Sequence, residues 1–177
     1  MLKYRITEIV HNLINKFNTR NPFEICDYLG IKIHYHDLCG KLKGYYMKHN
    51  GVPNIILDIN LPPEQRYIVC GHELGHHCLH SINMDTCSFA FSNDVHSETD
   101  ANLFCAELLL TDQEIMERTT YDSCTIFKVA EELYVPYWFV ECKLKMMNDK
   151  GIIHYIESDY IKSNSLAATV TEDHYRD

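Results

Sequence analysis

The sequence predicts an α+β fold, a mainly helical single domain with one small antiparallel sheet. Its 177 residues are 46% apolar, which is enough for one domain with a well-formed core. Apolar side chains recur at helical spacing in most segments, whereas β-branched and aromatic residues gather in three short stretches within residues 31–58. We therefore expect one domain over residues 1–157 and a polar, mobile tail over residues 158–177.

Two helices are expected before the sheet. Residues 1–17 intersperse charged side chains among apolar ones at helical spacing, a pattern typical of an amphipathic helix and not of an apolar export signal. A short second helix follows, because Asn21 can cap it, Pro22 suits its first position and Gly30 can end it.

Three short strands are expected to form the sheet: residues 31–35, 42–47 and 54–58. All three are rich in β-branched or aromatic residues. The last two are joined by residues 48–53, which contain Asn50-Gly51, a pair typical of tight hairpin turns. We therefore expect the strands to pair in an antiparallel manner.

The second half of the chain is expected to be mainly helical. Residues 62–80 show helical spacing of apolar side chains, and residues 81–96 show no clear period and are expected to form a long loop. Ser97–Asp100 and Thr111–Glu114 each resemble a capping box at the start of a helix. The remaining elements are two helices and a strand, predicted over residues 123–134, 136–148 and 152–157.

Composition argues against several partners and compartments. The chain has 16 Lys and Arg against 25 Asp and Glu, a formal net charge of −9, whereas proteins that bind nucleic acid or anionic membranes by charge carry the opposite sign. We therefore expect neither as a partner.

No apolar run approaches the roughly 20 residues of a membrane span. The eight cysteines include no C-x-x-C pair, so we expect reduced thiols in a cytoplasmic protein.

One motif carries metal chemistry, His72-Glu73-Leu74-Gly75-His76. Four residues turn an α-helix by about 400°, so His72 and His76 face the same way and can bind one Zn²⁺. Glu73 lies on the adjoining flank, where it can reach a water at the metal without being a ligand. The motif therefore predicts a zincin-like active-site helix with Glu73 as the general base.

A catalytic zinc site needs a third protein ligand. A third histidine of an extended motif is absent, because Leu79 and Ile82 stand where its glycine and histidine would fall. Glu98 is the preferred ligand, since Asn102 shares its helical face and can hydrogen-bond to the free ring nitrogen of His72 or His76. Asp100 lies about 200° around the helix from Glu98, so only one of the two can face the metal. Weaker alternatives are Asp85, Asp94 and His96.

Together, these residues resemble the ImmA/IrrE metallopeptidases of bacteria, phages and integrative elements. The resemblance rests on HELGHHCLH (residues 72–80) and ETDANLFCAELLL (residues 98–110), with support from NPFEICDYLGIKI, LKGYYM and VAEELYVPYWFVECKLKMM. It implies a zinc-dependent endopeptidase of narrow specificity, whose metal is held by the motif histidines and the glutamate of the second block. It also implies a protein substrate, a regulator such as a helix-turn-helix repressor of a phage or mobile element. Cys105 and Thr111 depart from the usual family pattern, but neither touches the expected zinc shell.

Two alternatives stay open at this point. The segment Thr125–Met147 can be a helix-turn-helix that reads DNA, although its second helix offers few cations beyond Lys143 and Lys145, and its three consecutive aromatic residues favour packing. The protein can instead be a catalytically silent, zinc-stabilised module that binds a repressor. Two further histidines near the motif, His77 and His80, are expected at the surface or at the rim of the site.

Overall fold

The computed structural model describes residues 2–80, 95–119 and 125–153, and these form seven helices and one three-stranded sheet. The helices are α1 (Leu2–Phe17), α2 (Pro22–Tyr28), α3 (Pro63–His80), α4 (Val95–Leu109), α5 (Asp112–Thr119), α6 (Ile126–Leu133) and α7 (Tyr137–Asp149). The strands are β1 (Lys32–His36), β2 (Gly44–His49) and β3 (Val52–Asp58). The mainly helical α+β fold is as predicted.

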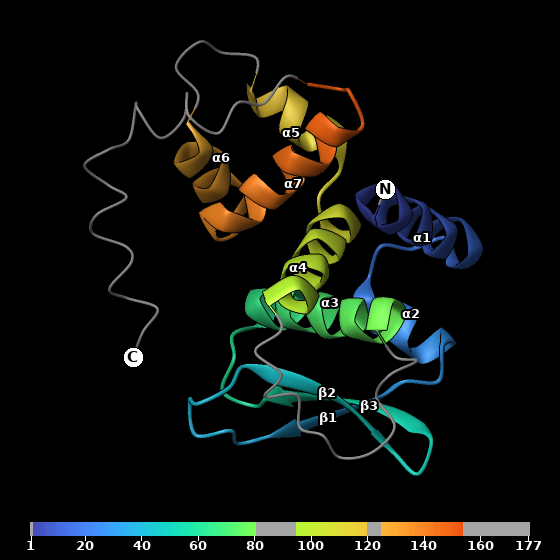
Figure 1. The fold of residues 1–177 in the computed structure, drawn as a ribbon. Helices are drawn as coiled ribbons and strands as arrows, with labels where there is room; N and C mark the ends of the chain where they lie inside the picture. Colours follow the sequence, from blue (N-terminus) through green and yellow to red (C-terminus); the bar gives the residue numbers. More distant parts are fainter. Residues whose placement is uncertain (1, 81–94, 120–124, 154–177) are drawn as a thin grey trace.

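Helix α4 links the two ends of the molecule. The sheet lies at one end with α3 across it, α4 crosses α3, and α5, α6 and α7 gather beyond the other end of α4 (Figure 1). One hydrophobic cluster, which includes Leu74 and Phe104, joins α1, α2 and the sheet to α3 and α4. A second cluster, which includes Ile115 and Phe139, joins the last turns of α4 to α5, α6 and α7. Movement of α4 would therefore disturb both clusters.

The sheet is mixed and not purely antiparallel, which corrects the prediction. Its strand order is β1-β3-β2. Strands β2 and β3 form the predicted antiparallel hairpin, and Asn50 and Gly51 in its turn have φ angles of 51° and 78°, as such tight turns require. Strand β1 pairs with the other edge of β3 in the parallel direction. The apolar strand β3 thereby takes the buried central place.

Local signals predicted several helix ends correctly. The side chain of Asn21 accepts a hydrogen bond of 3.0 Å from the backbone N–H of Phe23 at the start of α2. Gly30, with φ of 70°, follows the end of that helix. Thr111 and Glu114 form the predicted capping box, because the backbone N–H of each donates to the side chain of the other over 2.8 and 3.1 Å.

Two predictions of element boundaries were wrong. Helix α4 begins at Val95, so Ser97–Asp100 lies within its first turns and is not a cap. The chain turns at residues 151–153, where the last strand was expected to start, because Gly151 has φ of 71° directly after α7. The rest of that strand, most of the expected loop and the expected tail lie outside the described residues.

Helices α6 and α7 lie where they were predicted, and α7 packs into the domain. Phe139 and Val140 are fully buried. The Lys143 side chain is only 2% exposed, with its Nζ 2.8 Å from Glu107 Oε2 and 2.7 Å from Asp112 Oδ1. A helix that reads DNA needs its cations on the surface, so this arrangement supports the packing interpretation.

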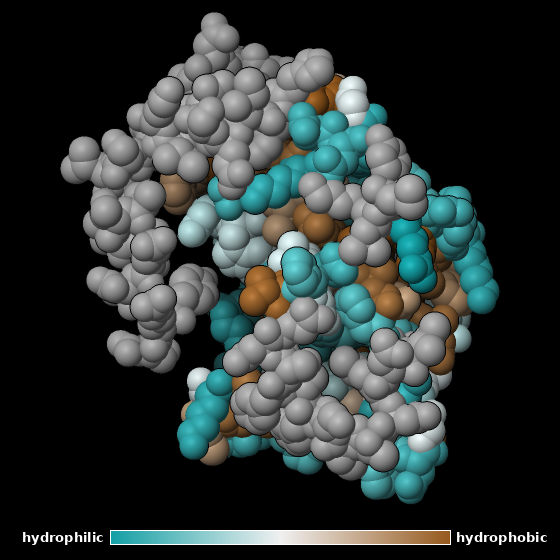
Figure 2. All heavy atoms as spheres, viewed as in Figure 1, coloured by the Kyte–Doolittle hydropathy of each residue, from teal (hydrophilic) through white to brown (hydrophobic). Residues whose placement is uncertain are grey.

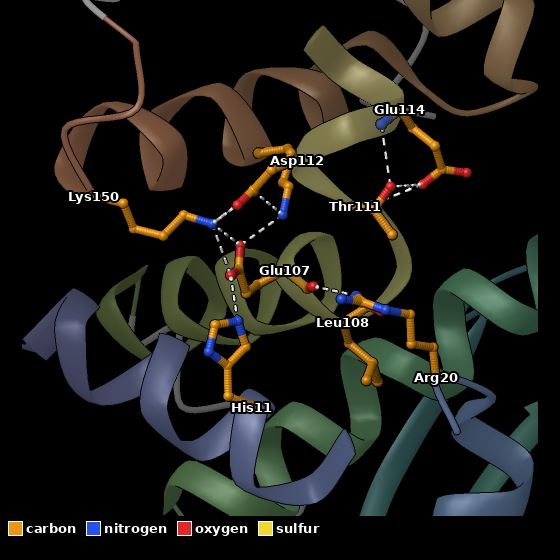
Figure 3. A network of polar contacts seen from close by, with 9 residues as sticks. His11, Arg20, Glu107, Leu108, Thr111, Asp112, Glu114 and Lys150 are labelled. Atoms are coloured by element: carbon orange, nitrogen blue, oxygen red, sulfur yellow. Dashed lines mark hydrogen bonds and ion pairs between the residues drawn. The ribbon is translucent and has the colours of Figure 1, made fainter. Parts of the chain in front are cut away.

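Buried charges anchor the C-terminal end of α4 (Figure 3). The Glu107 side chain is 2% exposed and lies between two cations, with Oε2 2.8 Å from Lys143 Nζ and Oε1 3.0 Å from Lys150 Nζ. Asp112 Oδ1 is 2.6 Å from Lys150 Nζ. Arg20 donates to the backbone oxygen of Leu108 over 2.9 Å. These contacts tie α4 to α5, to α7 and to the segment after α1.

We expect Glu107→Ala to lower the free energy of unfolding by about 3 to 5 kcal/mol, because removing one partner leaves a buried cation without full compensation. Urea denaturation of the purified variant measures this loss. The matched control is Glu132→Ala, since Glu132 is 49% exposed and lies 3.7 Å from Arg118 Nε, and exposed pairs contribute at most about 1 kcal/mol. Equal losses in both variants would contradict the structural role of the buried charges.

The surface of the described residues is chemically mixed. Figure 2 shows hydrophilic side chains around the apolar ones in the middle of the visible face, with hydrophilic side chains also prominent at the sheet end. No described helix is long and apolar enough to cross a membrane.

Candidate metal centre

Two glycines let α3 and α4 cross closely. A Cβ atom on Gly75 would lie 3.1 Å from Ala101 Cα and 3.2 Å from its carbonyl oxygen. A Cβ on Gly71 would lie 2.9 Å from Cys105 Sγ. Contacts this short would force the neighbouring atoms of α4 to move. The close crossing brings the first turns of α4 within reach of the polar side chains of α3.

The crossing gathers the three predicted ligands. His72 Nε2 lies 3.2 Å from Glu98 Oε2, and His76 Nε2 lies 3.3 Å from Glu98 Oε1. The two Nε2 atoms are 3.1 Å apart. One donor atom from each residue falls within 4.8 Å of the other two. Two imidazole nitrogens and one carboxylate oxygen are a donor set that zinc accepts in catalytic sites, so these residues fit the expected metal.

The Nδ1 atom of each histidine, on the other side of the ring from Nε2, also has a polar partner. His72 Nδ1 lies 2.9 Å from Asn102 Oδ1, which is the contact that the helical spacing of Asn102 predicted. Because the amide oxygen can only accept, Nδ1 carries the proton and Nε2 keeps its lone pair for a metal. His76 Nδ1 lies 3.3 Å from Ser97 Oγ. Sequence analysis missed this partner because the residues around Ser97 resemble a helix cap.

The other acidic and histidine candidates do not join this group. Asp100 Oδ2 lies 3.8 Å from His80 Nε2, on a different side of α4 from Glu98, as the rotation around the helix predicted. His96 is exposed on the first turn of α4. Asp85 and Asp94 lie outside the described residues.

The two glutamates near the histidines have opposite pKa shifts. The close contacts of Glu98 with the rings of His72 and His76 hold the pKa of Glu98 well below its usual range. Burial raises the pKa of Glu73, although the two histidines and a backbone hydrogen bond from Tyr46 oppose the shift. Neighbouring carboxyl groups whose pKa values are driven apart commonly have different roles. Glu98 suits a permanently charged ligand, and Glu73 suits a group that exchanges a proton.

A tyrosine that the sequence analysis did not single out lies on the flank of α3 that carries Glu73, where it contacts His77, a histidine expected at the surface or at the rim of the site. Tyr46 Oη, on β2, lies 2.9 Å from His77 Nδ1 on α3. Burial raises the pKa of Tyr46 to about 12, with a smaller contribution from Cys78, so its hydroxyl keeps its proton. Burial, followed by the charge of Lys48, lowers the pKa of His77. Helical spacing places His77 on the flank of Glu73, but only the packing of β2 on α3 identifies Tyr46.

Comparison with known proteins gives related matches. Residues 26–145 match the peptidase family described as IrrE N-terminal-like domain. A protein of Bacillus phage phi105 named uncharacterized immunity region protein 2 is 36% identical over 110 residues, which are 60% of this chain and 69% of the relative. Metallopeptidase ImmA of Bacillus subtilis (strain 168) is 29% identical over 143 residues, which are 78% of this chain and 83% of the relative.

Proposed function

The chain belongs to the ImmA/IrrE family of metallopeptidases, and from this we propose that it is a zinc-dependent endopeptidase of narrow specificity acting on a regulatory protein. The observation that carries the proposal is the meeting of His72, His76 and Glu98 across two helices, with donor atoms within 4.8 Å of one another. The buried carboxyl group of Glu73 lies on the adjoining flank of α3.

In this proposal, His72, His76 and Glu98 hold the zinc and Glu73 moves protons. When bound, zinc acts as a Lewis acid toward water and the peptide carbonyl. Glu73 accepts a proton from the attacking water and passes it to the leaving amine.

Strand β2 supports a protein substrate. It is an edge strand that packs against α3, and among the described residues no other strand covers its free edge. The N–H of Asp58 donates to the oxygen of Lys43 over 2.9 Å, so the alternation of an antiparallel ladder directs the backbone groups of Gly44 and Tyr46 away from β3. An extended peptide can add to such an edge as a further strand.

The names of the matched proteins support a regulatory protein of a phage or mobile element as the substrate. One is named an immunity region protein of a phage, and the other is named a metallopeptidase. We infer that the substrate is a helix-turn-helix repressor in the cytoplasm. The described residues contain six free cysteines, as suits a reducing compartment.

The test is cleavage of a helix-turn-helix repressor from the genome that encodes this chain. Zinc-loaded protein is incubated with the purified repressor and, separately, with casein, and the products are measured by intact mass. We expect cleavage of the repressor at one or a few bonds and little digestion of casein, because the acidic chain offers no long basic or aromatic-rich insertion for unspecific substrates. Rapid casein digestion that Glu73→Gln abolishes would contradict narrow specificity.

A further inference from the structure

Tyr46 contacts two residues on one flank of the active-site helix. Glu73 and His77 are four residues apart, so they lie one above the other on the side of α3 that faces β2. The backbone of Tyr46 lies near enough to the Glu73 carboxyl group to lower its pKa. Its hydroxyl lies 2.9 Å from His77 Nδ1, and the two rings meet edge to face with centroids 5.4 Å apart. One residue of the edge strand thus holds His77 on the same flank of the helix as Glu73.

The contact between Tyr46 and His77 selects one tautomer of the imidazole. Tyr46 is only 8% exposed, and a buried hydroxyl needs an acceptor for its proton. Within the described part of the chain, the structure gives His77 Nδ1 as the partner of this hydroxyl. If Tyr46 donates, Nδ1 accepts and the proton of the neutral ring resides on Nε2. His77 is half-buried, so part of the residue is exposed to solvent.

We propose that Tyr46 is a positioning residue, whose hydroxyl fixes His77 as an Nε2–H donor to a carbonyl oxygen of the peptide substrate. The inference rests on the proposed peptidase function. It assigns His77 to substrate contact, although His77 is not part of the metal centre. A peptide added to the free edge of β2 would run beside the strand that carries Tyr46.

The first test needs no substrate. Nitrogen-15 NMR of the zinc-loaded protein distinguishes protonated from unprotonated ring nitrogens of histidine. We expect His77 to be a single Nε2–H tautomer in the wild type and a mixture in Tyr46→Phe, which keeps the ring and the backbone N–H. Tyr45→Phe is the matched control, because Tyr45 is the adjacent residue on the other face of β2. A wild-type Nδ1–H tautomer, or an unchanged His77 in Tyr46→Phe, would overturn the proposal.

The second test separates binding from turnover with a proteome-derived peptide library, read by mass spectrometry. The substrate is the peptide that the wild type cleaves best. On it we expect Tyr46→Phe to lower kcat roughly 10- to 100-fold, which is the usual effect of losing a residue that orients a residue of the site. KM and zinc content should stay nearly unchanged. Tyr45→Phe should match the wild type. An unchanged kcat in Tyr46→Phe would overturn the positioning role.

The two tests also separate this inference from the proposed function. If the zinc-loaded wild type cleaves neither the library nor the repressor, the peptidase proposal fails, and with it the substrate contact of His77. The tautomer measured by NMR then still decides whether Tyr46 orients the imidazole. Retention of more activity by His77→Gln than by His77→Ala would support the donor role, because glutamine keeps an N–H group.

Discussion

Glu73→Gln is expected to reduce peptide cleavage by roughly a hundred- to ten-thousand-fold, which is the usual contribution of general acid–base catalysis. Glutamine has nearly the size of glutamate and can accept the hydrogen bond from the backbone of Tyr46, but it cannot take a proton from water. The fold should be retained, since an uncharged amide is less costly to bury than a carboxylate. Zinc content should also be retained, because Glu73 is not one of the three gathered ligands.

The measurement combines three readouts on one preparation of Glu73→Gln. Cleavage of the co-expressed repressor is followed by mass, zinc is determined by metal analysis, and the fold is checked by circular dichroism. Full cleavage by a zinc-loaded variant would contradict the peptidase mechanism. In that case the silent, zinc-stabilised binding module becomes the better interpretation, because such a module should tolerate Glu73→Gln with its binding intact.

Glu98→Ala is expected to reduce zinc affinity most among substitutions on α4. It removes the carboxylate that lies between His72 and His76, so only two donors remain. The loss should exceed the roughly 10- to 100-fold expected for Asn102→Ala, which removes a hydrogen bond to a ligand but no ligand. His76→Ala should lose zinc to a similar extent as Glu98→Ala.

Asp100→Ala is the matched control for the third ligand. Asp100 lies on the same turn of α4 but faces His80, so its removal should leave zinc affinity nearly unchanged. Competition with a chromophoric chelator gives the affinity of each variant, and metal analysis of the purified proteins should give close to one equivalent only where the site is intact. Full zinc in Glu98→Ala together with loss in Asp100→Ala would reverse the assignment.

Short-range sequence patterns determined much of the fold and of the candidate centre. The four-residue spacings of His72 and His76, and of Glu98 and Asn102, depend only on the geometry of an α-helix. The cap at Asn21 and the hairpin turn at Asn50-Gly51 likewise depend on the conformational preferences of a few adjacent residues. Such features can be predicted because the interacting groups are close in the chain.

Only the tertiary structure decided which separate segments meet. The parallel pairing of β1 with β3 depends on which edge of the hairpin is free, and the contact of Ser97 with His76 depends on how α4 crosses α3. The burial of Lys143 against Glu107 and the hydrogen bond from Tyr46 to His77 join residues 36 and 31 positions apart. Helical and strand periodicity identify the face on which a side chain lies, but the partner of that face is determined by packing of the whole chain.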